Sequence, residues 1–415
     1  MAFAANYHLD EEEEDYVLRH APAFLGPTAV EVRDTLFCGR VRYHRGAARL
    51  LDEAIANAVD HCLAAAQEAV YVDFVRDMLE VINPARVPVN GRLGFCNTVI
   101  PRALLRTPRV SSHDGYHTLV GRYGMGLKMI HLLSEDVTVE VSDGEASYTY
   151  QPDGNDDYEE IVSDSPLWDL RAGNRFFRLR FAVSAAAFGT QRAVVMDGLE
   201  DYLRSRLFEL SFYLYETKHD ISLFYNGERV CCASPRLAGP VIVVKRFPVT
   251  YCTGLGRSFQ GQASAFLYRD PDVSSASLGR DSLVNGVRVE NLSSAREVLR
   301  RLEEASPLAC VAGINAYLVI ECPGIVFSDH AKTRVNGCFE IPAGLFSARD
   351  GARVAARPER RPSLRELGVF VATRMLPLDL IAASYVASVM PVDSMSGRLV
   401  IAMLIARYAM IKFLS

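Results

Sequence analysis

Two segments constrain the fold of this 415-residue chain more than any other part of its sequence. In residues 51–60, helical periodicity places a carboxylate, a carboxamide and a second carboxylate at positions i, i+4 and i+7, which are Glu53, Asn57 and Asp60. Residues 121–128 form a glycine-rich loop that runs directly into an apolar helical run. Such a loop lets main-chain N–H groups approach phosphates closely, and the helix N-terminus adds a positive potential. Together the two segments predict a nucleotide-binding site.

The helix residues have side chains that suit nucleotide hydrolysis. A carboxylate at the edge of a pocket, such as Glu53, can accept a proton from an attacking water, which typically contributes ~10²–10⁴-fold to a rate. The amide oxygen of Asn57, one turn further on, can bind Mg²⁺, which prefers hard oxygen ligands. For this helix taken alone, the alternative is an ordinary solvated acidic face.

Polar and basic groups near the glycine loop strengthen the prediction. Arg122 and Lys128 lie within or beside the loop, and Ser111, Ser112 and His113 lie a short way upstream. Hydroxyl groups and basic side chains are the partners that a triphosphate requires.

Composition limits the functions open to the chain. The net charge of −5 provides no overall positive field for nucleic acid, so a DNA contact would need a local basic patch. The candidates for that patch lie in or beside one loop, which is otherwise expected to be merely solvated: Arg353, Arg357, Arg360, Arg361 and Arg365. The 9 scattered cysteines lack C-x-x-C spacing and predict reduced thiols in the cytoplasm or nucleus, rather than disulfides or zinc.

Neither end of the sequence predicts a membrane span. The first residues are polar and acidic, unlike a secretory signal. The most apolar stretch, residues 399–414, is interrupted by Arg407 and Lys412 and is shorter than the ~20 residues that a span needs. We expect a packed C-terminal helix there, with interfacial membrane contact as the alternative.

Periodicity and turn residues predict a mixed succession of elements, with a change of composition at residues 233–240. Helices are expected at residues 40–67, 199–215 and 293–304. Strands are expected at residues 70–75, 78–82, 137–141, 148–151, 176–183, 221–225, 241–246, 263–268 and 316–321. Asn226 and Gly227, directly after an expected strand, predict a hairpin turn.

Four blocks of the sequence match, in order, the motifs of one family. They are residues 16–26 (an N-terminal block ending in Tyr-Ile-Gly in the family), residues 52–60 (Asp-Glu-x-x-x-Asn-x-x-Asp), residues 121–128 (Gly-Arg-Asn-Gly-Tyr-Gly-Ala-Lys), and residues 320–323 with 330–332 (a strand and its Gln-Thr-Lys loop). In these blocks the chain resembles the ATPase region of type IIA DNA topoisomerases. That region belongs to the GHKL (Bergerat) family, which also includes gyrase, MutL and a heat-shock chaperone.

The resemblance implies an α/β fold, in which a Bergerat-type (GHKL) α/β sandwich is followed by a transducer-like α/β domain and C-terminal helices. The expected boundaries are an N-terminal arm at residues 1–25, an ATPase-like domain at 26–235, a transducer-like domain at 236–385 and a helical segment at 386–415.

The resemblance also implies roles for individual residues, with ATP and Mg²⁺ as cofactors. Glu53 would be the water-activating base, Asn57 the Mg²⁺ ligand, and Lys332 would reach from the second domain to the terminal phosphate. The remaining nucleotide-binding residues that it implies are Asp60, Asn83, Ser111, Ser112, His113, Gly121, Arg122, Tyr123, Gly124, Met125, Gly126 and Lys128.

One block departs from the family pattern. The family's second glycine box, Asp/Asn-x-Gly-x-Gly-Ile-Pro-Val, corresponds to residues 82–89, where Pro84 and Arg86 replace both glycines. Without a gap, Ile82 takes the adenine-contacting position, and Asn83 can do so only if the register shifts by one residue. If the turn needs a positive φ, a non-glycine residue costs roughly 1–2 kcal/mol, and we expect Arg86 to add bulk where the ligand would lie.

Three functions therefore remain open. The first is an ATP-binding, homodimerising module of topoisomerase type with weak or conditional ATP hydrolysis; it would not cleave DNA by itself, because no cleavage region follows. The second is a scaffold that has lost nucleotide binding. The third is an ATPase subunit that assembles with a separate cleavage subunit.

Overall fold

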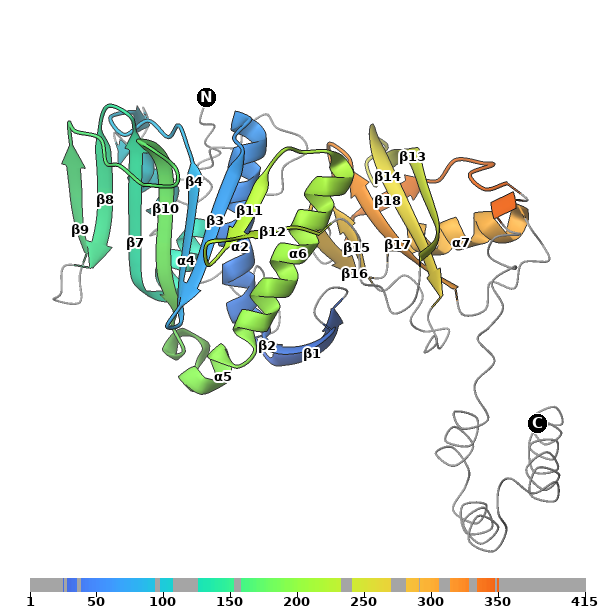
Figure 1. Ribbon diagram of the computed structural model, residues 1–415, viewed down its shortest axis with the longest axis horizontal. Helices are drawn as coiled ribbons and strands as arrows, with labels where there is room; N and C mark the ends of the chain where they lie inside the picture. The colour runs from blue at the N-terminus through green and yellow to red at the C-terminus, as the bar shows by residue number, and fades with distance from the viewer. Residues whose placement is uncertain are drawn as a thin grey trace, which may run out of the picture. The chain divides into compact units, whose positions relative to one another are not determined.

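The computed structural model of the chain describes residues 25, 28–35, 39–93, 98–106, 126–152, 158–232, 241–269, 281–290, 292–305, 314–327, 334–347 and 349–350. All of them belong to one compact unit, Met1–Ala355. Two large sheets make up this part of the chain (Figure 1). One core cluster includes the first sheet, its helices and some side chains of the second sheet, such as Phe266 and Tyr317, and another lies within the second sheet and α7.

The first sheet is 8-stranded and mixed. Across the sheet its strands are β12 (Glu228–Val230), β11 (Ser222–Tyr225), β3 (Ala69–Val75), β4 (Met78–Pro84), β10 (Arg175–Val183), β7 (Ser134–Asp143), β8 (Ser147–Pro152) and β9 (Tyr158–Ser163). Neighbouring strands are antiparallel, apart from the parallel pair β11 and β3.

Helices pack on the central strands of this sheet. α2 (Arg45–Ala65) contacts β3 and β4, α4 (Gly126–Leu133) contacts β7 and β10, and α6 (Leu199–Thr217) contacts β11 and α2. Shorter elements complete this part of the chain: α3 (Ile100–Arg106), α5 (Arg192–Met196), the 3-10 helix at Ala186–Phe188, and the strand pair β5 (Arg92–Leu93) and β6 (Thr98–Val99).

The first predicted helix begins later than its apolar pattern indicated. The chain forms β2 (Gly39–His44), which pairs with β1 (Val30–Thr35), and α2 starts only at Arg45. Alternation explains the correction, because Val41 and Tyr43 are buried whereas Arg40 and Arg42 are exposed, which is the period of a strand. The His44 imidazole then accepts a hydrogen bond from Ala47 N at 3.2 Å and caps the helix.

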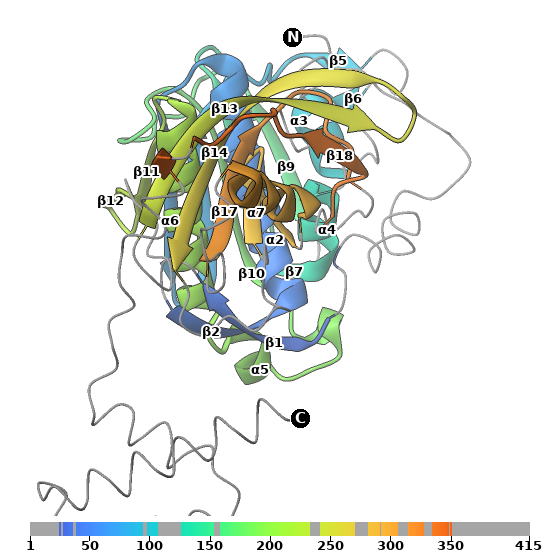
Figure 2. The same ribbon diagram turned by 90° about the vertical axis from the view of Figure 1, so that its right-hand side faces the viewer.

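The second sheet is 6-stranded. Its strands, in order, are β16 (Val287–Glu290), β15 (Asp281–Val284), β17 (Ile314–Glu321), β14 (Ser258–Arg269), β13 (Val241–Thr253) and β18 (Gly337–Glu340). α7 (Ser293–Ala305) packs against β17 and β18, and Figure 2 shows it in front of the strands of this sheet. The apolar residues of α7, such as Val298 and Leu302, are buried in the core beneath it.

The predicted strands and the two later helices are confirmed, with bounds that differ by a few residues, most of all at β13 and β14. The hairpin at Asn226 and Gly227 is also confirmed, since it joins β11 to β12 and both residues have positive φ, 48° and 81°. Most of the other strands that escaped prediction have two to four residues, too few to show a period: β5, β6, β12, β15, β16 and β18. The six-residue strands β1 and β9 were also missed.

Several predictions lie outside the described residues. They are the acidic N-terminal arm, the compositional change at residues 233–240, the arginine-rich loop and the C-terminal helix. Among the helices that the structure does describe, none combines the length and apolar character needed to cross a membrane.

Candidate functional site

Glu53 and the start of α4 are in direct contact. A Cβ atom added to Gly126, the first residue of α4, would lie 2.6 Å from Glu53 Oε2. The Glu53 side chain is 6% exposed, so its carboxylate lies in a closed space between α2 and the helix that follows the glycine loop. The absence of a side chain at Gly126 is therefore what makes room for the carboxylate.

Arg49 holds the Glu53 carboxylate in place, a role that the motif analysis missed. Its guanidinium lies 2.6 Å from Glu53 Oε1, one helical turn away, and both side chains are largely buried. A buried carboxylate needs such a partner because burial disfavours its charged form. The i, i+4 spacing of Arg49 and Glu53 in α2 was the signal that could have revealed the pair.

The structure assigns Asn83, rather than Ile82, to the helix-covered face of the first sheet. Side chains alternate along a strand, and Leu79 and Val81 on β4 belong to the core shared with α2. The pairing of β4 with β10 continues to Pro84 without a shift in register. Asn83 therefore points to the same face of the sheet as Val81, and Ile82 points to the opposite face. The structure therefore brings Asn83 to the face that α2 covers, and its contact with adenine stays a prediction.

The environment of Asn83 suits the recognition of a polar group. The side chain is 2% exposed, and its amide donates to Pro84 O at 2.9 Å. This bond orients the side chain, whose oxygen is the atom able to accept a hydrogen bond from an amino group.

The residues that end β4 and follow it correct one expectation. None of the residues 84–86 has a positive φ, so the predicted cost of replacing the glycines does not arise. Arg86 is exposed to solvent and Ala85 is buried, so the arginine side chain is not packed in the core.

Main-chain hydrogen bonds anchor the segment that follows β4 at both ends. Ala85 N donates to Arg175 O at 3.1 Å, and Val89 N donates to Asp143 Oδ2 at 2.9 Å. Burial favours the neutral form of Asp143, but the N–H groups of Val89, Ala146 and Glu145 outweigh it and lower the pKa of that carboxyl.

The other described candidates lie on the same two helices. Asn57 is partly exposed on α2, and Lys128 is 2% exposed in the first turn of α4. Asp60 is 5% exposed. Burial, then the charges of Glu321 and Asp60, raise the pKa of Tyr213 on α6 well above its usual value. The remaining predicted residues lie outside the described part of the chain: Ser111, Ser112, His113, Gly121, Arg122, Tyr123, Gly124, Met125 and Lys332.

A buried ionic network connects α2 to the second sheet. Asp52, next to Glu53, accepts a hydrogen bond from Tyr202 at 2.6 Å and pairs with Arg206 Nε at 3.1 Å, both on α6. Arg206 Nη2 also donates to Gly286 O at 2.7 Å, in the turn between β15 and β16. Burial, and then the Asp52 charge, raises the pKa of Tyr202 well above its usual value, so this phenol stays a hydrogen-bond donor.

A second carboxylate, Glu209 on α6, extends the network that begins at Asp52 on α2. Glu209 is only 1% exposed and pairs with Arg206 at 3.7 Å and with Arg288 of β16. Another polar contact to the second sheet joins His219 Nε2 to Oε1 of Glu321, the last residue of β17, at 2.7 Å. The helix that carries Glu53 is thus connected by polar contacts to the second sheet.

Asn285 fixes the end of the β15–β16 turn to the end of β17. Its amide donates to Cys322 O at 2.8 Å, and its side-chain oxygen accepts from Cys322 N at 2.9 Å. Its φ of 50° lies in the left-handed region, which asparagine tolerates better than most residues.

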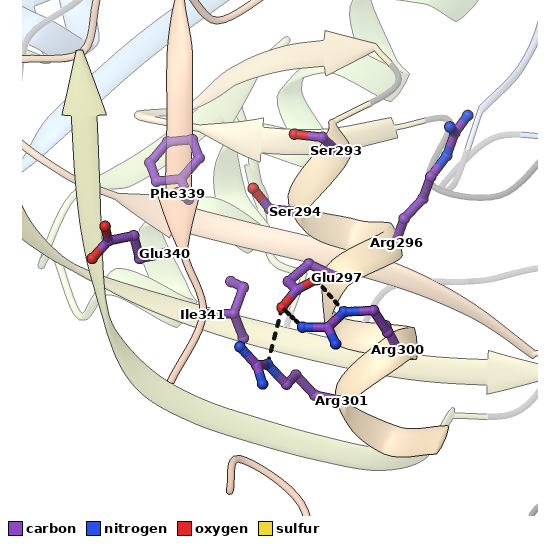
Figure 3. Close-up of a pocket in the computed structure, with 9 residues that line it drawn as sticks. All are labelled: Ser293, Ser294, Arg296, Glu297, Arg300, Arg301, Phe339, Glu340 and Ile341. Carbon is purple, nitrogen blue, oxygen red and sulfur yellow. Dashed lines mark hydrogen bonds and ion pairs between the residues drawn. The ribbon is translucent and has the colours of Figure 1, made fainter. Parts of the chain in front are cut away.

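A groove of about 650 Å³ lies in the second sheet, between α7 and β18 (Figure 3). The arginines on its α7 side, Arg300 and Arg301, are paired with Glu297 and Glu304. The groove is therefore not an open basic site. Within the described residues, no group of three or more His, Cys, Asp or Glu side chains is arranged to hold a metal ion.

Comparison with solved structures places this arrangement among known folds. The ATPase region of Saccharomyces cerevisiae topoisomerase II is similar with a TM-score of 0.58 and 15% identity, covering 92% of this chain and 98% of that chain. The same region bound to ICRF-187 (dexrazoxane) is similar with a TM-score of 0.59 and 14% identity, covering 91% and 99%. The ATPase and transducer domains of DNA topoisomerase II from Balamuthia mandrillaris are similar with a TM-score of 0.63 and 14% identity, covering 84% and 93%.

No family model and no curated protein matches the sequence of the chain. The structural similarity nevertheless confirms the fold that the four sequence blocks predicted. The chain has the GHKL ATPase-plus-transducer fold of type II topoisomerase ATPase regions.

Proposed function

We propose that the chain is an ATP-binding module of the type II topoisomerase kind that hydrolyses ATP slowly with Mg²⁺. The observation that carries the proposal is the position of the Glu53 carboxylate. It pairs with Arg49 at 2.6 Å and lies against Gly126, the first residue of α4. A carboxylate fixed beside a helix N-terminus that can receive a phosphate is placed to accept a proton from an attacking water.

The residues around Glu53 divide the work of binding and hydrolysis. Asn83 accepts a hydrogen bond from the adenine amino group, and the glycine loop with Lys128 receives the phosphates. Glu53 takes a proton from the attacking water, and Asn57 supplies an oxygen to Mg²⁺. The cation, when bound, neutralises charge that develops on the phosphate oxygens. Lys332 contributes a positive charge from the second domain.

Two variants test the proposal by calorimetry and steady-state hydrolysis with Mg²⁺ and ATP. We expect micromolar binding by the wild type. Asn83→Leu should bind about 10–100-fold more weakly, since a lost buried hydrogen bond costs roughly 1–3 kcal/mol. Glu53→Gln should still bind ATP but lose on the order of 10²-fold in turnover.

The exposed Glu228, in the hairpin between β11 and β12, provides a matched control. Glu228→Gln should leave both binding and turnover unchanged. If Glu53→Gln and wild type turn over ATP equally, the catalytic role of Glu53 is wrong even where binding is present.

A scaffold without nucleotide is the second candidate. It is favoured by Pro84 and Arg86, which stand where the resemblance expects glycines. Absence of ATP binding by the wild type, with recovery in Arg86→Gly, would support this function instead.

We also propose that the chain forms a homodimer when nucleotide is bound. Sedimentation of the full chain with and without a non-hydrolysable ATP analogue tests this step. A monomer under both conditions would contradict dimerisation and leave the binding proposal intact.

A further inference from the structure

Two cysteines face each other across neighbouring strands of the second sheet. Cys252 on β13 and Cys338 on β18 are direct partners in the antiparallel register, and both are free thiols. Among the described residues, β18 is the last strand in the order of the sheet. Cys338 is exposed and Cys252 partly exposed.

The two thiols and Glu340 form one polar cluster on the outer face of the sheet. Cys252 Sγ donates to Glu340 Oε1 at 3.5 Å, and Cys338 is close enough to interact with the Cys252 thiol. Alternation along β18 places Cys338 and Glu340 on the same face, because Phe339 between them is buried while both are exposed.

The other described cysteines lack this combination of contact and access. Cys62 and Cys322 are buried, and burial raises the pKa of their thiols to about 12 and about 11. Cys231 and Cys232 are adjacent in the chain, where a disulfide would strain the intervening peptide.

We propose that Cys252 and Cys338 form a reversible redox site that low-molecular-weight disulfides oxidise to an intramolecular disulfide. The exposed Cys338 thiolate attacks one sulfur of glutathione disulfide, forms a mixed disulfide and releases one glutathione thiolate. Cys252 then gives its proton to Glu340 or to solvent and attacks the Cys338 sulfur, releasing the second glutathione. In sum, two protein thiols are oxidised, and one glutathione disulfide is reduced to two thiols.

The position of the pair makes the bond labile. Directly opposite residues of antiparallel strands have Cβ atoms about 4.5–5.5 Å apart, whereas a disulfide prefers about 3.5–4.5 Å. A disulfide that draws the strands together is strained, and strained, exposed disulfides are the more easily reduced ones. Glu340 affects the rate of closing instead. Slight burial and then its hydrogen bond and charge raise the pKa of Cys252, which lowers the fraction of thiolate available for attack.

The bond would fasten β18 to β13. β18 begins at Gly337, and in oxidised protein it could not separate from β13. The redox site does not depend on the proposed function.

Peptide mapping of the native full-length chain tests the site without nucleotide. After incubation with glutathione disulfide and blocking of free thiols, trypsin releases Cys252 in residues 247–257 and Cys338 in residues 335–349. We expect a peptide pair joined by a disulfide that dithiothreitol separates. Its yield should fall about tenfold or more when oxidation is carried out in urea, because unfolding removes the high local concentration of the two thiols.

Serine variants separate the two steps. Cys252→Ser should accumulate the glutathione adduct on Cys338, because the resolving thiol is absent. Cys232→Ser, a control in the adjacent pair, should form the linked peptides as the wild type does. The proposal is overturned if native wild type carries separate glutathione adducts on both cysteines, or if linkage is as frequent in urea.

Discussion

Replacing Arg206 by methionine should destabilise the protein more than removing any exposed ion pair. The Arg206 guanidinium lies 3.1 Å from Asp52 Oδ1, 2.7 Å from Gly286 O and 3.7 Å from Glu209, and its side chain is only 7% exposed. Methionine keeps much of the apolar volume but removes the hydrogen bonds to Asp52 and Gly286 O and the ion pair with Glu209.

The size of the effect follows from the burial of the carboxylates. Removing one partner of a buried ion pair costs about 3–5 kcal/mol, because the remaining charge is left uncompensated. Tyr202 still donates to Asp52, and Arg288 still pairs with Glu209, so each carboxylate keeps one partner. We therefore expect a loss near the lower limit, about 3 kcal/mol in the free energy of unfolding.

Arg204→Met on the same helix is the matched control. Arg204 is 54% exposed and pairs with Glu200, which is 50% exposed, so its removal should cost about 1 kcal/mol or less. Urea unfolding of both variants, followed by far-ultraviolet circular dichroism, measures the difference. If Arg206→Met costs no more than Arg204→Met, the buried network does not hold α2, α6 and the β15–β16 turn together.

Three further predictions concern the site helix, its pH response and a helix start. Gly126→Ala should fold but lose about 10²-fold in ATP turnover, because the added Cβ would lie 2.6 Å from Glu53 Oε2 and displace the carboxylate. An unchanged kcat would contradict this role of Gly126. Burial lowers the pKa of His61 from 6.5 to about 4, so unfolded protein binds the extra proton first and stability falls as pH drops from 6.5 to about 4. His61→Gln should flatten this slope in unfolding free energies measured at pH 7 and 4.5, and an unchanged slope would point to other groups. Gly198→Ala should reduce the thermal midpoint far more than Gly189→Ala, since both have positive φ but only the Gly198 Cβ meets a main-chain oxygen, at 1.7 Å; equal shifts would refute the clash.

Features governed by residues close together in the chain were accessible from the sequence. The helical period of α2 brought Glu53 and Asn57 to one flank, and the Asn226–Gly227 pair specified its hairpin, because both depend on local geometry. Four short blocks were sufficient to identify the fold, since a phosphate loop and its helix tolerate few residue types. The same local signals misplaced the start of α2, because only pairing with β1 turns residues 39–44 into a strand.

The tertiary structure decided which side chains meet. Whether Asn83 or Ile82 faces α2 depends on the register of β4 against β10, and a shift of one residue reverses every side chain. The approach of Arg206 to Asp52 and the opposition of Cys252 and Cys338 join residues far apart in the sequence. Sequence periodicity determines which face of an element is buried, but only the packing of distant elements determines what that face is buried against.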